Sequence, residues 1–84
     1  MHAEIVLPEL GTASAILSAW FADSGETVYE GDRLVEVLVH GATFDVAAPA
    51  TGRLIERRAL TNDSLQTGQV LGVVEVQDLR EDPG

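Results

Sequence analysis

The side chain best suited to chemistry lies in one short stretch, Leu38-Val39-His40-Gly41-Ala42. The imidazole of His40 could act as a pH switch, a metal ligand or a nucleophile. However, a His-Gly pair between two alternating apolar runs is typical of a two-residue hairpin turn, in which both residues take positive φ. The pattern therefore favours an exposed turn histidine over a catalytic or metal-ligating one.

Two other groups invite a chemical interpretation. Glu36 and Asp45 would face each other across this hairpin, as a carboxylate pair for acid–base catalysis does. Both are expected on the outer face with no pocket implied, which favours a solvated surface. Asp63-Ser64-Leu65 matches the attachment tripeptide of phosphopantetheine carriers, but those are helical bundles. We expect Ser64 in a β-turn and give that match little weight.

The hairpin itself predicts one inward and one outward face, because successive side chains of a strand alternate. Closing it at His40-Gly41 pairs Val39 with Ala42. The expected core face holds Val35, Val37, Val39, Ala42, Phe44 and Val46, and the other face holds Glu36, Leu38, Thr43 and Asp45. Leu38 would then be an exposed docking residue with Val39 packed inward beside it, although single exposed apolar residues are common.

Further strands are predicted wherever short apolar runs lie between Gly, Pro, Asn and Asp turns. They cover residues 4–7, 15–21, 28–29, 53–60 and 70–76, with a turn at 61–64. The run 15–21 is apolar and Ala-rich enough for a helix, but its alternation and lack of a cap favour a strand. We expect one domain over residues 1–77 and a flexible acidic tail over 78–84.

The chain also repeats itself. Residues 24–34 align with 61–71 at a constant separation of 37 positions, and the Pro-x-x-Gly at 8–11 is echoed at 49–52. Two similar halves made of short strands suggest two small sheets related by a pseudo-twofold axis. The sequence therefore predicts an all-β fold, a flattened barrel or sandwich that covers both inner faces.

Composition narrows the functional classes. The 84 residues suffice for one small domain, and the net charge of −9 argues against nucleic acid or an anionic membrane as partner. There is no cysteine, and His2 and His40 show no metal-ligand spacing, so no metal site is expected. No apolar run is long enough for a membrane span and no signal peptide is evident, which predicts a cytoplasmic protein. We also expect it to be a monomer. The basic residues are all arginine, at 33, 53, 57, 58 and 80, with no lysine.

From Glu4 to Val76 the sequence resembles the lipoyl/biotinyl carrier domains, and the lipoyl branch most closely. The resemblance lies in the order and spacing of residues 7–11, Trp20, and residues 24–32, 42–52 and 68–71. It implies two four-stranded antiparallel sheets in a flattened barrel with pseudo-twofold symmetry. It also implies a domain without an active site of its own, of the kind found in acyltransferase subunits of 2-oxo acid dehydrogenase complexes.

The hairpin tip departs from that family. Members carry a modified lysine within Glu-Thr-Asp-Lys-Ala, where Gly41 takes the lysine position, His40 the preceding acid and Leu38 the glutamate, and only Ala42 is kept. The resemblance therefore makes His40, Gly41 and Ala42 the cofactor-binding positions. Lipoate and biotin are held by an amide to a lysine amine, and arginine is not a comparable nucleophile. We expect no cofactor, although lipoate is the family's usual one.

Three functions remain to be compared. The first is a lipoyl-like protein-binding or structural module that meets a protein partner, such as 2-oxo acid dehydrogenase subunits, through Leu38, Val39 and the acidic surface. The second is a functional acyl or cofactor carrier with an unusual attachment, or a module of a biotin-dependent enzyme. The third, an enzyme in its own right, lacks a nucleophile–base pair, a metal set or a phosphate loop to support it.

Overall fold

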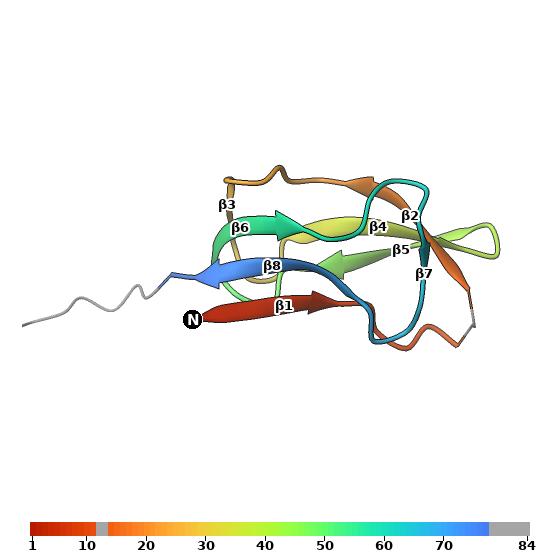
Figure 1. Ribbon diagram of the computed structural model, residues 1–84. Coiled ribbons are helices and arrows are strands. Elements are labelled where there is room, and N and C mark those ends of the chain that lie inside the picture. The colour runs from red at the N-terminus through yellow and green to blue at the C-terminus, as the bar shows by residue number, and fades with distance from the viewer. Residues whose placement is uncertain (12–13, 78–84) are drawn as a thin grey trace, which may run out of the picture.

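The computed structural model describes residues 1–11 and 14–77, and within these every regular element is a strand (Figure 1). The strands are β1 (His2–Val6), β2 (Ala15–Trp20), β3 (Thr27–Val28), β4 (Arg33–Val39), β5 (Ala42–Ala47), β6 (Gly52–Arg57), β7 (Ser64–Leu65) and β8 (Val70–Val76). They form two four-stranded sheets, in the orders β1-β8-β6-β3 and β5-β4-β2-β7. All strand pairs are antiparallel, so the predicted all-β architecture of two four-stranded sheets is confirmed.

Several predicted bounds need correction. The first strand covers His2–Val6 rather than residues 4–7, and the third covers Thr27–Val28 rather than 28–29. The sixth strand ends at Arg57 rather than at residue 60, because the backbone N–H groups of Arg58 and Ala59 both donate to the carbonyl of Leu71 and bend the chain. The turn predicted over 61–64 ends earlier, since Ser64 already begins β7. A strand of two residues carries no periodicity that a sequence pattern could reveal. The predicted tail, residues 78–84, lies outside the described residues.

The internal repeat is a structural repeat. Strands β2, β3 and β4 return as β6, β7 and β8 exactly one repeat length of 37 positions later, and the turns return with them. Glu26 accepts the N–H of Asp23 through Oε1, just as Asp63 accepts the N–H of Leu60 through Oδ2. The turn hydrogen bonds therefore follow the pseudo-twofold relation that the sequence repeat predicts.

The core lies between the two sheets, whose inner faces supply its side chains. The largest buried residues are Ile5, Leu17, Leu34, Leu54, Leu65 and Leu71. Bulges in the β4–β5 and β2–β4 pairs break strict alternation, so that consecutive Leu34 and Val35 are both buried. Burying each such side chain contributes about 1.5–3 kcal/mol, which makes this face-to-face packing the main source of stability.

Trp20 connects the two sheets. Its ring packs against the core, and its indole Nε1 donates a hydrogen bond of 2.8 Å to the carbonyl of Ala59. The ring also approaches Gly72 of β8, where an added Cβ would come within 3.0 Å of the ring and 2.6 Å of the Glu56 carbonyl. Trp20 therefore anchors the packing between the two sheets.

Gly52 offers a sharp test of this close backbone packing. A Cβ at Gly52 would collide with the backbone carbonyl of Glu75, so Gly52→Ala is expected to cost about 3 kcal/mol or more in the free energy of unfolding. Gly31→Ala is the matched control, because a Cβ there meets open space and only its φ of +93° opposes the change. The control should cost about 1–2 kcal/mol. Equal losses in urea titrations of the two variants would contradict this account.

Candidate functional site

The candidate site is the tip of the β4–β5 hairpin, which projects from the end of the molecule opposite β3 and the N-terminus (Figure 1). His40 and Gly41 have φ of 49° and 80°, so both central residues of the turn are left-handed, as a type I′ turn requires. Val39 pairs with Ala42, Val37 with Phe44 and Val35 with Val46. The predicted two-residue turn and its register are thus confirmed.

The predicted core face of the hairpin is only partly correct. Val35, Val37, Val39 and Val46 are buried, but Ala42 is exposed and Phe44 retains 42% of its surface. The strand β5 lies at a sheet edge, and the turn after β3 contacts only its far end, where the N–H of Gly31 donates to the carbonyl of Ala48. Near the tip that cover ends, so Ala42 and Phe44 meet solvent.

Glu36 and Asp45 face each other across the strands, as predicted. Each has its own partner: Glu36 accepts a hydrogen bond of 2.9 Å from Ser18 Oγ, and Asp45 lies 3.7 Å from Arg33 Nη1. Neither carboxylate lines a cavity described below. Each carboxylate is engaged by its own partner on an open sheet face, and no cavity beside them could hold a substrate, so the solvated-surface interpretation holds.

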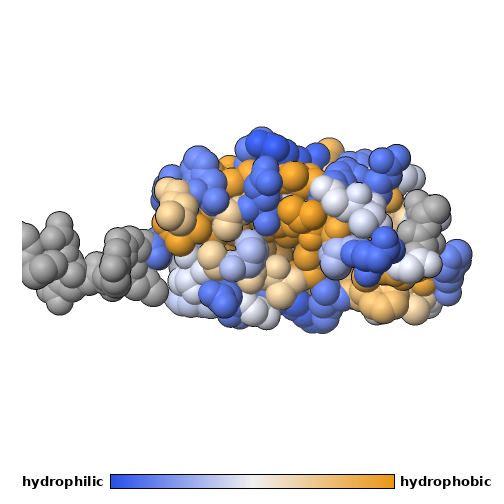
Figure 2. All heavy atoms as spheres, turned by 90° about the horizontal axis from the view of Figure 1, so that it is seen from below, coloured by the Kyte–Doolittle hydropathy of each residue, from blue (hydrophilic) through white to orange (hydrophobic). Residues whose placement is uncertain are grey.

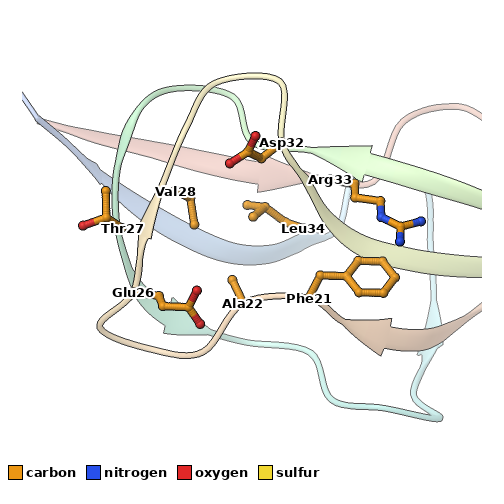
Figure 3. Close-up of a pocket in the computed structure, with 8 residues that line it drawn as sticks. All are labelled: Phe21, Ala22, Glu26, Thr27, Val28, Asp32, Arg33 and Leu34. Carbon is orange, nitrogen blue, oxygen red and sulfur yellow. The ribbon is translucent and has the colours of Figure 1, made fainter.

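Two shallow cavities lie away from the tip. One of about 290 Å³ is formed by Phe21, Ala22, Glu26, Thr27, Val28, Asp32, Arg33 and Leu34 (Figure 3). The Arg33 guanidinium lies 4.3 Å from the Phe21 ring centroid, and the Glu26 and Asp32 carboxylates accept backbone N–H groups of their own turns. The other, about 340 Å³, is lined by Thr27, Arg53, Glu75, Val76 and Gln77. The Glu26 and Asp32 carboxylates stabilise turns, and the two cavities show no catalytic constellation.

The remaining sequence candidates do not assemble into a second site. Ser64 begins β7 and pairs with Ile16, so its predicted place within a turn is wrong, and it does not start a helix either. Across residues 1–11 and 14–77, no three His, Asp or Glu side chains gather in a way that could hold a metal ion. The same residues contain no helix long and apolar enough to span a membrane.

One neighbour of the tip was not identified from the sequence. Ile16 of β2 pairs with Leu38 of β4, and these two outward side chains keep 41% and 38% of their surface exposed. The sequence offered one signal, because Ile16 alternates with buried Ala15 and Leu17. Its position beside Leu38 depends on a pairing between distant segments, which no local pattern reveals.

The tip does not suit a carrier group joined through an amide. Such a group needs a primary amine as its attachment point. Gly41 has no side chain, and its neighbours His40 and Ala42 provide an imidazole and a methyl group. A Cβ at Gly41 would meet no atom within 4 Å, so the space for a side chain is open while the amine is missing. The residues at the tip therefore do not fit lipoate or biotin held in this way.

Comparison with known proteins agrees with this architecture. A family model described as "Biotin-requiring enzyme", the biotin/lipoyl family, matches residues 3–74. A succinyltransferase component of the 2-oxoglutarate dehydrogenase complex from Bartonella vinsonii subsp. berkhoffii is 35% identical over 77 residues, which cover 89% of this chain. The match spans only 19% of that longer protein.

A solved structure shows the same fold. The lipoyl domain of the 2-oxoglutarate dehydrogenase complex from Azotobacter vinelandii is 25% identical, with a TM-score of 0.65. The match covers 84% of this chain and 90% of the solved domain. The family match, the sheet topology and the hairpin register agree, and the chain therefore belongs to the biotin/lipoyl family and folds as a lipoyl domain.

Proposed function

We propose that this domain is a lipoyl-type module that carries no lipoate and acts by binding another protein. The observation that supports the proposal is Gly41, a central residue of a well-formed hairpin turn. We infer that it takes the position of the family's lysine, as the resemblance of the tip implies. Around it the strands pair in regular register, and Val35, Val37 and Val39 are buried. The side chain that would bear the cofactor is missing, whereas the hairpin that would hold it is present.

The proposed partner is a subunit of a 2-oxo acid dehydrogenase complex. Support comes from the similarity to a domain within a succinyltransferase component of the 2-oxoglutarate dehydrogenase complex. We also propose that the domain lies in the cytoplasm. The net charge of −9 disfavours contact between two copies, so we propose that the domain itself is monomeric.

We further propose that the domain catalyses no reaction of its own. Glu36 and Asp45 each contact a partner of their own. The carboxylates of Glu26 and Asp32 accept hydrogen bonds from backbone N–H groups of their turns. The alternative is a carrier with an unusual attachment, or a module of a biotin-dependent enzyme, as the description of the family model suggests. These two functions differ from the first in one measurable property, the presence of a covalent group.

Intact mass measures that property directly. The chain purified from its native host is expected to show the mass of the unmodified polypeptide, because no tip side chain carries a primary amine. A lysine-containing lipoyl domain expressed in the same cells serves as the control and should acquire its lipoyl group. An adduct of lipoyl or biotinyl size on this chain would overturn the proposal.

Restoring the lysine tests whether the scaffold is otherwise intact. Gly41→Lys combined with His40→Asp is expected to make the domain a substrate for a lipoate ligase, as measured by mass after incubation with lipoate and ATP. The open space at Gly41 accepts the side chain, and the φ of +80° should cost about 1–2 kcal/mol of unfolding free energy.

The matched control is Gly41→Arg combined with His40→Asp, which keeps the charge and the strain but supplies no amine nucleophile. It should remain unmodified. If the folded lysine variant also stays unmodified, then either the tip geometry differs from that of the family or Leu38 blocks recognition. Adding Leu38→Glu separates these two explanations, because only a block by Leu38 predicts that the triple variant becomes modified.

A further inference from the structure

Each sheet has a row of four outward positions, and the two rows occupy equivalent places in the two halves. Their side chains differ in chemistry. Across one sheet the row runs Thr43, Leu38, Ile16 and Ser64, as the strand registers show. The pseudo-twofold relation carries this row onto its counterpart in the other sheet. That second row contains His2, Glu75, Arg53 and Thr27 in the same order.

The second row is ionic. His2 Nε2 lies 3.8 Å from Glu75 Oε2, and Arg53 is the cross-strand neighbour of Glu75. The same backbone position therefore tolerates charged side chains in one half of the molecule and carries exposed apolar ones in the other. Because the two halves share their fold, folding alone does not require Leu38 and Ile16 to be apolar.

Exposed apolar side chains occur in both sheets, since Val6 and Ile55 of the charged sheet are 41% and 37% exposed. The outward position that corresponds to Glu36 is nevertheless covered in the charged sheet. Val73, outward in the charged sheet, is only 5% exposed between Glu4 and Glu56. Arg58 lies 3.1 Å from Glu56 beside it, and the hydrogen bond and charge of Glu56 raise the pKa of the Arg58 guanidinium. Ile16 and Leu38 have no comparable cover and remain 41% and 38% exposed.

The charge around these residues defines what would cover them. Glu36 and Asp45 form the next outward pair on the same strands, one pleat away from Leu38 and Thr43. Arg33 contacts Asp45 at the far side, and the β2 residues beside Glu36 are Ser18, which donates a hydrogen bond to it, and Ala19, neither of which is basic. An apolar contact bordered by carboxylates complements a surface in which apolar side chains are surrounded by arginine or lysine.

We propose that Thr43, Leu38 and Ile16, here called the tip stripe, dock a protein partner whose contact surface is apolar with a basic border. This inference rests on the proposed function as a protein-binding module and names the surface and the chemistry of its partner. A second copy of this chain is disfavoured as occupant, because it would bring its own carboxylates against Glu36 and Asp45. Leu38 lies two residues before His40, so the tip stripe is next to the hairpin turn.

The test is an NMR titration of the isotope-labelled domain with a synthetic peptide that alternates arginine and leucine. Chemical shift changes are expected at Ile16, Leu38 and Thr43 and not at the equivalent positions 53, 75 and 2. A peptide of arginine and serine should bind at least about tenfold more weakly, and one of glutamate and leucine should not bind, because both apolar contact and charge are needed.

Variants taken from the protein's own symmetry sharpen the test. Ile16→Arg with Leu38→Glu reproduces residues of the ionic row without changing net charge, and it is expected to weaken binding by about tenfold or more. The matched control, Arg53→Ile with Glu75→Leu, also preserves net charge and should retain the binding at the tip stripe. Leu38→Thr, which adds no charge, provides a milder variant if the double variant fails to fold, and should weaken binding about threefold.

The inference is overturned if shift changes spread equally over both sheets, or if the stripe variants bind like the parent domain. Concentration-dependent shifts at the stripe without peptide would identify a second copy as its occupant and would equally overturn it. Intact mass of the same sample keeps the two proposals apart. An adduct would refute the proposed function, whereas an unmodified chain that fails to bind through the stripe would refute this inference alone.

Discussion

The fold depends on main-chain hydrogen bonds that join the end of each long edge strand to a turn between the two sheets. After β1, Leu7 exchanges hydrogen bonds with Gly68 and Gln69, and after β5, Ala48 does the same with Gly31 and Asp32. These paired contacts close the sandwich at both edges and hold the apolar inner faces together. A domain of 84 residues without cysteine has no covalent cross-link to replace them.

This closure explains why the tip can change without loss of the scaffold. Val35 and Val37 are fully buried and set the register of β4 against β5 well before the turn is reached. A register slip would turn these valines outward, which the core does not permit. The turn then needs only two residues that accept positive φ, and His40 with Gly41 meets that need. Backbone geometry and side-chain chemistry at the tip are therefore separable.

The same separation applies to the surface. Pseudo-twofold symmetry gives the molecule an internal control, because each outward position has a partner with a similar backbone environment. Differences between partners, such as Leu38 against Glu75, cannot come from demands of the fold that both halves share. Figure 2 shows apolar atoms between hydrophilic groups on one face of the molecule. Outward positions at which the two halves carry different side chains are therefore the best guide to function.

The sequence by itself determined most of the strand pattern, the repeat of 37 positions, the hairpin register and the residue at the tip. These follow from local rules: alternation places valines inward, Gly and Asn accept left-handed turns, and the missing amine is a matter of composition. Tertiary structure decided the exposure of Phe44, the two-residue strand β7 and the pairing of Ile16 with Leu38. Each of these depends on what a distant segment covers or pairs with, and local periodicity holds no record of that contact.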